Sequence, residues 1–283
     1  MILLKRSNDL SNYLDSQRKQ GKNVNFVPTM GALHPGHLSL ITNAKTNDSL
    51  CVCSIFVNPT QFNDAVDFKK YPVTIENDIL LLETAGCDLL FLPSVDEIYP
   101  NGTKPTRHYD LGYLETVLEG KYRPGHFQGV CMVVHRLLDL VRPDKLQIGQ
   151  KDYQQCMVIK TLVHLIGMGD TVKVIISPTL RESDGLAMSS RNARLTEGDR
   201  KKAVKIFETL QFIRLEIRPG NLNMLKEQAA QRLTESGFKV DYIEIADAGT
   251  LQIADQWDGK QKLVALAAAF LNGVRLIDNI LLR

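Results

Sequence analysis

The chain has 283 residues, of which 44% are hydrophobic and 23% are charged, as is typical of a soluble globular protein large enough for two domains. Its 34 lysines and arginines against 32 aspartates and glutamates leave a formal net charge of +2, which argues against a nucleic-acid-binding surface. No apolar run approaches a membrane span and the amino-terminal residues do not form a signal peptide, so we expect a cytoplasmic protein without a membrane partner.

The five cysteines lie mostly in apolar stretches, and none of them forms a C-x-x-C pair. No zinc-binding spacing is present. We therefore expect reduced thiols in the core of an intracellular protein.

Strands and helices alternate through the first half of the chain. The expected helices are 7–20, 38–45, 74–85, 128–142 and 153–166, and the expected strands are 24–27, 50–57, 89–92, 145–148 and 172–176. The nearly continuous apolar run 50–57 suits a central strand that is covered on both faces. This alternation predicts a doubly wound parallel α/β sheet.

The pattern changes after Pro178. A capping-box-like start at Thr196 precedes a helix whose apolar stripe runs to Ile217, and the segment 222–235 is expected to form a second helix. Strands are expected at 240–245 and 262–269. We therefore predict a Rossmann-like nucleotide-binding domain over residues 1–179 and a small α+β domain over residues 180–283.

The turn between the first buried strand and its helix carries two glycines and two histidines. Gly31 and Gly36 let the chain bend sharply and let a ligand approach the backbone. His34 and His37 are three residues apart and can present both rings at the start of the helix, where N–H groups and the helix dipole favour phosphate. A turn with two surface histidines is the alternative, but the strand-turn-helix context favours a nucleotide site.

Other polar residues follow strands that end at the same carboxyl edge. In the segment 149–152, Lys151 would supply a point charge for phosphate, while Asp152 is either a ligand contact or only the helix N-cap. Gln155 falls on the first turn of the next helix. Gln61 follows the strand 50–57 and offers a neutral amide to a substrate.

A polar loop, 188–191, follows Asp184-Gly185. Ser189 and Ser190 supply two hydroxyls and Arg191 a guanidinium, a combination that can surround phosphoryl oxygens. Taken alone, this triplet fits a solvated loop better.

The remaining histidine-containing segments carry less information. The basic loop 123–127 either faces the same cleft or lies on the surface. His108, His135 and His164 have no comparable context and are expected to be structural.

Assembled in order, these motifs resemble the pantothenate synthetase family, the pantoate–β-alanine ligases, over essentially the whole chain. The motifs that carry the resemblance are Pro28-Thr29-Met30-Gly31-Ala32-Leu33-His34-Pro35-Gly36-His37, Phe56-Val57-Asn58-Pro59-Thr60-Gln61-Phe62, Tyr99-Pro100-Asn101-Gly102, Arg123-Pro124-Gly125-His126-Phe127, Lys151-Asp152 with Gln155, and Asp184-Gly185-Leu186-Ala187-Met188-Ser189-Ser190-Arg191-Asn192. Each motif alone is modest, but their joint order and spacing are highly specific.

The resemblance implies a HIGH-type nucleotidyltransferase in which 34–37 is the HIGH-like motif and 188–191 replaces KMSKS. It implies that pantoate attacks the α-phosphate of ATP to give pantoyl adenylate and pyrophosphate, and that β-alanine then displaces AMP to give pantothenate. It also implies Mg²⁺ with ATP, a homodimer, and a C-terminal domain that closes over the adenylate.

The implied site residues fall into three groups. Phosphate stabilisation is assigned to His34, His37, Lys151, Ser189, Ser190 and Arg191, with His37 as proton donor. ATP is expected to contact Met30, Gly31, Ala32, Leu33, His34, Pro35, Gly36, His37, Gly149, Gln150, Lys151, Asp152, Leu180, Met188, Ser189, Ser190 and Arg191. Pantoate is assigned to Gln61 and Gln155, and β-alanine to Gln61.

One residue departs from the family pattern, because Gln150 stands where the family often has glutamate. Any role of a carboxylate there is in doubt. The alternatives are another adenylyltransferase of the superfamily, a small aminoacyl-tRNA synthetase, and a nucleotide-binding regulatory module without catalysis. The balanced charge argues against tRNA, and the retained cationic and hydroxyl groups argue against a non-catalytic module.

Overall fold

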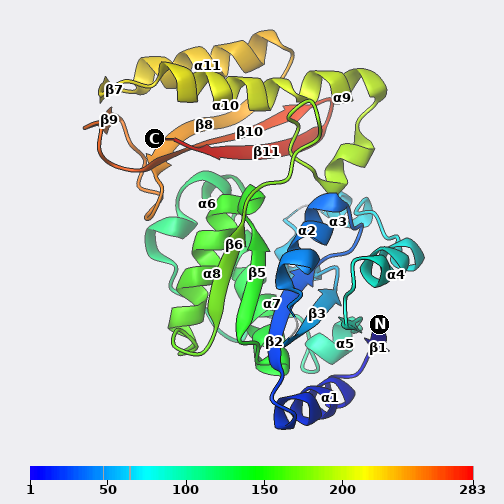
Figure 1. Ribbon diagram of the computed structural model, residues 1–283. Helices are drawn as coiled ribbons and strands as arrows, with labels where there is room; N and C mark the ends of the chain where they lie inside the picture. Colours follow the sequence, from blue (N-terminus) through cyan, green and yellow to red (C-terminus); the bar gives the residue numbers. More distant parts are fainter. Residues whose placement is uncertain (47, 64, 283) are drawn as a thin grey trace. The chain divides into compact units, whose positions relative to one another are not determined.

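The computed structural model describes residues 1–46, 48–63 and 65–282. The chain forms two compact units (Figure 1), of which the first comprises Met1–Gln150 and Val158–Pro178 and the second comprises Lys151–Met157 and Thr179–Arg283. The segment that begins the predicted helix 153–166 thus groups with the C-terminal residues. In the described part of the chain, no helix has the length and apolarity needed to span a membrane.

The first unit is built on a parallel sheet. Six strands are described, in the order β1-β4-β3-β2-β5-β6, and all their pairings are parallel. Their bounds are β1 Ile2–Leu4, β2 Asn23–Thr29, β3 Ser49–Ile55, β4 Leu89–Phe91, β5 Lys145–Gly149 and β6 Lys173–Ser177. The predicted doubly wound sheet is confirmed, and its strand order reverses between β2 and β5.

The long helices lie where the sequence predicts them. They are α1 Ser7–Lys19, α2 Pro35–Ala44, α4 Ile75–Thr84, α7 His126–Val141 and α8 Tyr153–Leu165. The sequence does not predict the short helices α3 Ala65–Lys69, α5 Val95–Ile98 and α6 Leu118–Tyr122, nor the 3-10 turns η1 Pro59–Gln61, η2 Gly112–Glu115 and η3 Gln150–Asp152. Such short elements offer too few residues to show a period.

The apolar run that suggested a central strand is buried along its whole length. Every residue of β3 is buried, as expected for a strand covered on both faces. On one face, Cys51, Cys53 and Ile55 pack with Ile41 of α2 and Leu82 of α4. This packing fixes α2, and therefore the start of α2, relative to the sheet.

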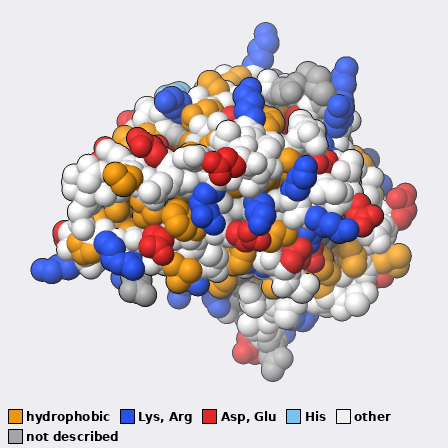
Figure 2. Space-filling view, turned by 90° about the horizontal axis from the view of Figure 1, so that it is seen from above, with side chains coloured by type: hydrophobic (Ala, Val, Ile, Leu, Met, Phe, Trp, Pro, Cys, Tyr) orange, Lys and Arg blue, Asp and Glu red, His pale blue; other side chains and the backbone are white. Residues whose placement is uncertain are grey.

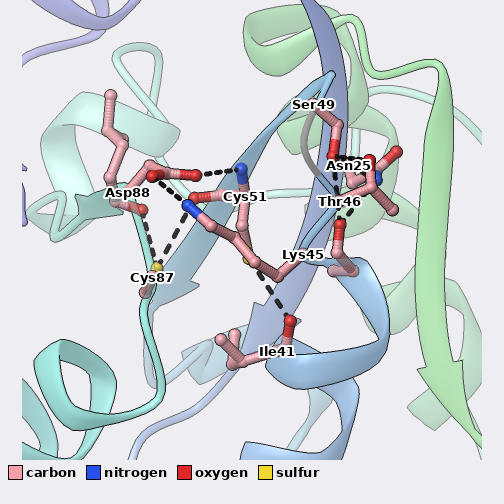
Figure 3. A network of polar contacts seen from close by, with 10 residues as sticks. Asn25, Ile41, Lys45, Thr46, Ser49, Cys51, Cys87 and Asp88 are labelled. Carbon is pink, nitrogen blue, oxygen red and sulfur yellow. Dashed lines mark hydrogen bonds and ion pairs between the residues drawn. The ribbon is translucent and has the colours of Figure 1, made fainter.

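A polar network joins the amino-terminal parts of β2 and β3 to the end of α2 (Figure 3). The Asn25 Nδ2 donates to the Ala44 carbonyl at 2.6 Å and to the Ser49 Oγ at 2.9 Å. Lys45 pairs with Asp88, whose Oδ2 also accepts the Cys51 N–H at 2.8 Å. These contacts anchor the last turn of α2.

All five cysteines lie within the described residues, and each is a buried thiol outside any disulfide. Burial raises the pKa of Cys53 well above its ordinary value, and burial likewise raises the pKa of Cys131 to about 12. Both are therefore neutral at physiological pH and unreactive. The prediction of reduced core thiols is confirmed.

The second unit contains a three-stranded antiparallel sheet in the order β11-β10-β8, with helices packed on it. The strands are β8 Lys239–Asp247, β10 Leu263–Leu271 and β11 Val274–Leu281, and a small ribbon pairs β7 Gly220–Asn221 with β9 Gln256–Trp257. The helices are η4 Ser190–Arg194, α9 Glu197–Ala203, α10 Lys205–Glu216 and α11 Asn223–Glu235. The sequence predicts one helix where α9 and α10 are divided at Val204, and it does not predict β11.

The N-cap of α9 agrees with the predicted capping box. The Thr196 Oγ1 accepts the Asp199 N–H at 3.1 Å and donates to the Asp199 Oδ2 at 2.7 Å.

Over α10 and α11, acidic and basic side chains are interspersed (Figure 2), so this face differs from the single-sign surface of a nucleic-acid-binding protein.

A glycine sets the distance between α7 and the loop after β3. A Cβ on Gly129 would overlap the Thr60 carbonyl group and lie 2.8 Å from the Cα of Gln61. We expect Gly129→Ala to lower the free energy of unfolding by about 1–3 kcal/mol, because α7 and η1 must separate. Urea denaturation measures this change.

Gly198 in α9 provides the matched control. The nearest atom to a Cβ there is the Thr196 Oγ1 at 4.0 Å, so Gly198→Ala should leave stability unchanged or raise it by up to about 1 kcal/mol. Equal stability of the two variants would contradict the close approach of α7 and η1.

Candidate functional site

The turn from β2 to α2 brings the two predicted imidazoles together. His34 occupies the N-cap position of α2, Pro35 is its first residue, and His37 lies in its first turn. The ring centroids of His34 and His37 are 4.0 Å apart, at an angle of 37°. Both rings therefore belong to the positive end of the helix dipole, where anions are stabilised.

The backbone that leads to these histidines is left-handed at two consecutive residues. Gly31 has φ +80° and Ala32 has φ +50°. Glycine adopts this conformation without strain, whereas alanine does so at a cost of about 1 kcal/mol or more. Some other part of the protein must therefore hold Ala32 in place.

Asp78 of α4 holds the turn, and the sequence does not predict this role. The Asp78 Oδ2 accepts the Ala32 N–H at 2.9 Å, and the Oδ1 accepts the Leu33 N–H at 2.8 Å. The Thr74 Oγ1 adds a third hydrogen bond at 3.0 Å. The carboxylate is fully buried. Its two partners in the turn lie 45 and 46 residues away along the chain and are backbone groups, so no sequence motif marks the interaction.

Gln61 lies beside Met30, so the turn and the loop after β3 meet. The Gln61 Nε2 lies 2.9 Å from the Met30 Sδ, and the Gln61 Oε1 accepts the Asn58 Nδ2 at 3.1 Å. Asn58 is buried and also donates to the Gly129 carbonyl at 3.1 Å. The amide of Gln61 is thus oriented by Asn58, a residue to which the sequence analysis assigns no role.

Tyr99 also contacts Asn58 in the loop after β3. Its hydroxyl donates to the Asn58 Oδ1 at 2.8 Å, and burial raises the pKa of Tyr99 to about 12. The phenol therefore remains a protonated donor over the physiological pH range. It fixes which way the Asn58 amide points, since an O–H donor must face the amide oxygen.

The basic loop 123–127 contacts the segment that carries Gln61 through His126, while Pro124 and Gly125 of the same loop are exposed. The buried His126 ring places its Nδ1 2.7 Å from the Gln61 carbonyl oxygen, and its Nε2 is 3.1 Å from the Arg123 Nη1. Arg123 also approaches the Glu119 carboxylate at 3.7 Å. By contrast, His135 contacts the Tyr109 hydroxyl at 2.8 Å, in keeping with a structural role.

Gly149 and Gln150 end the neighbouring strand. Asn25 and Phe26 of β2 pair with Lys145 and Leu146 of β5, so the carboxyl ends of both strands lie at the same edge of the sheet. Within the first unit, the structure therefore gathers the β2–α2 turn and the end of β5 at the position where the strand order reverses, and Gln61 contacts that turn. Ligands of open α/β sheets bind at such positions.

Lys151 and its neighbours group with the second unit. The Lys151 carbonyl accepts the Asn279 Nδ2 at 2.8 Å, and the Tyr153 hydroxyl donates to the Ala248 carbonyl at 2.6 Å. The Lys151 ammonium lies 3.7 Å from the Asp152 carboxylate. Gln155 is half-buried on the first turn of α8.

The residues around the Ser-Ser-Arg triplet form a compact loop. The Met188 N–H donates to the Leu180 carbonyl at 3.1 Å, which brings these two candidates together. Ser189 is the N-cap of η4, and its Oγ accepts the Arg191 N–H at 3.3 Å. Ser190 and Arg191 follow in η4, both half-buried.

A buried ion pair supports this loop, and the sequence does not predict it. Arg181 donates to both carboxylate oxygens of Asp278, at 2.6 and 3.0 Å, and its guanidinium lies 4.1 Å from the centre of the Phe207 ring. Burial raises the pKa of Asp278, although the Arg181 charge opposes that rise. A third donor of the same group reaches the Gly185 carbonyl at 3.1 Å.

Comparison with known proteins assigns the chain. A sequence model of the family described as pantoate-beta-alanine ligase matches residues 2–281. The chain belongs to the pantoate-β-alanine ligase family. This result confirms the resemblance that the motifs indicate, and the chain is an enzyme of this ligase class.

Relatives in this family match over nearly their whole length. The pantothenate synthetase of Cytophaga hutchinsonii is 42% identical over 285 residues, which cover 100% of this chain and 99% of the relative. That of Porphyromonas gingivalis is 44% identical over 276 residues, which cover 96% and 95% of the two chains.

Solved structures of the family share the fold. The Thermus thermophilus pantothenate synthetase has a TM-score of 0.86 and 38% identity, with 99% of both chains covered. The pantoate-β-alanine ligase of Francisella tularensis, solved as a complex with beta-gamma ATP and β-alanine, has a TM-score of 0.84 and 38% identity, with 99% of this chain and 97% of that chain covered.

The Arg181–Asp278 pair gives a testable prediction for this family member. Asp278→Asn leaves the guanidinium largely buried without its counter-charge, so we expect the second unit to lose about 3–5 kcal/mol of stability. The single tryptophan, Trp257, is buried in this unit, and its fluorescence during urea denaturation reports the loss.

Glu197→Gln is the control for that change. It removes the same charge from a pair with Lys201 in which both side chains are strongly exposed, so the shift should stay below about 0.5 kcal/mol. A comparable shift in both variants would show that the buried pair contributes no more than a surface pair.

Proposed function

We propose that this enzyme condenses pantoate with β-alanine at the expense of ATP, through a pantoyl-adenylate intermediate. The observation that carries the proposal is the pair of imidazoles at the start of α2, held at the reversal point of a Rossmann-like sheet. The ATP and β-alanine named for the Francisella tularensis relative support it.

In the first step, a carboxylate oxygen of pantoate attacks the α-phosphorus of ATP. The new bond is O–P, and the bond from the α-phosphorus to the bridging oxygen breaks, so that pyrophosphate leaves. Negative charge grows on the phosphoryl oxygens and on the leaving group. We propose that His34, His37 and Lys151 stabilise this charge together with Ser189, Ser190 and Arg191, since positioned cationic and hydroxyl donors are the main catalytic device for such transfers.

In the second step, the amine of β-alanine attacks the acyl carbon of the adenylate. A C–N bond forms, the acyl C–O bond breaks, the amine loses a proton to solvent, and AMP leaves with the electron pair of the broken bond. We assign Gln61 as a contact for β-alanine, and we assign His37 as the proton donor among the residues that stabilise the phosphates. Acyl adenylates hydrolyse in water, so we propose that residues 180–283 act as a lid that excludes it.

Pantoate is proposed to contact Gln61 and Gln155. Neutral amides orient a carboxylate without lowering its nucleophilicity as a lysine or arginine would. In the described loop, the Asn58 contact at 3.1 Å and the Met30 contact at 2.9 Å hold the Gln61 amide before any substrate binds. This preorganisation reduces the entropy that substrate binding must overcome.

Mg²⁺ is proposed to accompany ATP. Among the described residues, no group of three or more histidine, cysteine, aspartate or glutamate side chains could hold a metal ion. That fits a cation carried mainly by the phosphates, as Mg²⁺ usually is in nucleotide sites. When bound, Mg²⁺ would neutralise charge on the phosphates. A cytoplasmic homodimer is also proposed.

Pyrophosphate release tests the first step. With ATP and Mg²⁺, we expect release with pantoate and not with a panel of other carboxylic acids, and AMP should appear only after β-alanine is added. Absence of release with pantoate, or equal release with another acid, would contradict the proposed substrate.

His37→Ala tests the catalytic assignment. We expect pyrophosphate release to slow by roughly two to three orders of magnitude, as for the loss of one donor to a developing oxyanion. His108→Ala, at an exposed position, should leave the rate unchanged. A near-normal rate for His37→Ala would remove this residue from the mechanism.

A further inference from the structure

The anion held by the β2–α2 turn is the protein's own carboxylate. Successive backbone N–H groups in a turn can converge on one anion, as they do on phosphate in many nucleotide sites. Here those N–H groups belong to Ala32 and Leu33, and both donate to Asp78. They are therefore not available to a phosphate while Asp78 is in place.

We propose that Asp78 is a positioning residue for the catalytic histidines. Leu33 immediately precedes His34, so fixing the Leu33 N–H fixes where α2 begins and where both rings point. The inference rests on the proposed function of His34 and His37. Because Asp78 occupies the Ala32 and Leu33 N–H groups, we expect the ATP phosphates to bind the first turn of α2 and its side chains, and not the turn before it.

The surroundings of Asp78 fit positioning better than direct catalysis. Its side chain is fully buried, so it cannot touch a substrate. In the described part of the chain its partners are three uncharged donors, from Ala32, Leu33 and Thr74. Hydrogen bonds from neutral donors to a carboxylate are about twice as strong as those between neutral groups, which suits a residue that must hold a strained turn.

The contact between Asp78 and the turn requires glycine at position 31. A Cβ on Gly31 would lie 3.0 Å from the Asp78 Oδ2 and 3.0 Å from the Ile55 Cγ2, while φ +80° already disfavours other residues. The glycine therefore lets the carboxylate approach. The turn and Asp78 fit together as one unit, although their residues are far apart in the sequence.

Asp78→Asn tests this role with little change in volume. The asparagine oxygen can accept one of the two N–H groups, but its NH₂ group then faces the other donor. We expect kcat for pantoate-dependent pyrophosphate release to fall about 10- to 100-fold through misplacement of the rings, with KM for ATP changed less than threefold. Glu76→Gln is the matched control, because Glu76 is an exposed acid in the same helix turn, and both constants should be unchanged.

A measurement on the unmodified enzyme keeps the proposal testable if Asp78→Asn does not fold. Hydrogen exchange of the Ala32 and Leu33 amides, followed by NMR, should be slow and should not change when a non-hydrolysable ATP analogue binds. Rapid exchange without ligand that becomes slow with the analogue would show that phosphate uses these groups, and would overturn the proposal. A folded Asp78→Asn variant with kcat within twofold of normal would also overturn it.

The two proposals fail in different ways. If the unmodified enzyme releases no pyrophosphate with pantoate, the proposed function is wrong, while the exchange measurement still tests the link between Asp78 and the turn. If the unmodified enzyme is active and Asp78→Asn only lowers the unfolding temperature, Asp78 is structural and the proposed function is unaffected.

Discussion

The parallel pairing of β2 with β5 is the constraint on which the amino-terminal unit depends. From β2 the chain proceeds to β3 on one side, and from β5 it proceeds to β6 on the other. Right-handed crossovers in opposite directions lie on opposite faces of a sheet, so neither helix crosses the carboxyl ends of these two strands. The residues that follow Thr29 and Gly149 are consequently placed at one sheet edge by topology alone, before any side chain contributes.

Topology brings the segments to one edge, but buried polar side chains set their conformations. Asp78 fixes the β2–α2 turn, and Asn58 fixes the loop after β3 through Gln61, Tyr99 and the Gly129 carbonyl. Their chemistry differs because the groups they hold differ. Two N–H groups directed at one point suit a carboxylate, which only accepts, whereas a loop offering both donors and acceptors suits an amide. Exchanging either side chain for its isostere should therefore leave a buried donor or acceptor unsatisfied.

The extent to which the sequence predicts the site follows from the range of each interaction. The strand, turn and helix around His34 and His37 depend on neighbours within ten residues, and periodicity with glycine spacing is enough to predict them. The contact of Asp78 with the turn, and that of His126 with Gln61, join backbone groups to side chains 45 or more residues away. A single sequence contains no pattern for such a contact, because a backbone partner leaves no residue type to recognise.

Strand β11 is a second feature that the sequence does not predict. Its residues alternate in burial for the first half, but Asp278 and Asn279 interrupt the apolar pattern and hide the strand. Both side chains are nonetheless buried, since Asp278 binds Arg181 and Asn279 binds the Lys151 carbonyl. A polar pair in a buried strand is destabilising unless each group is satisfied, and here the partners are two segments that carry candidate phosphate ligands. The alternation of apolar residues therefore fails at the two positions where β11 binds Arg181 and the Lys151 carbonyl. One strand thus holds both segments within the second unit.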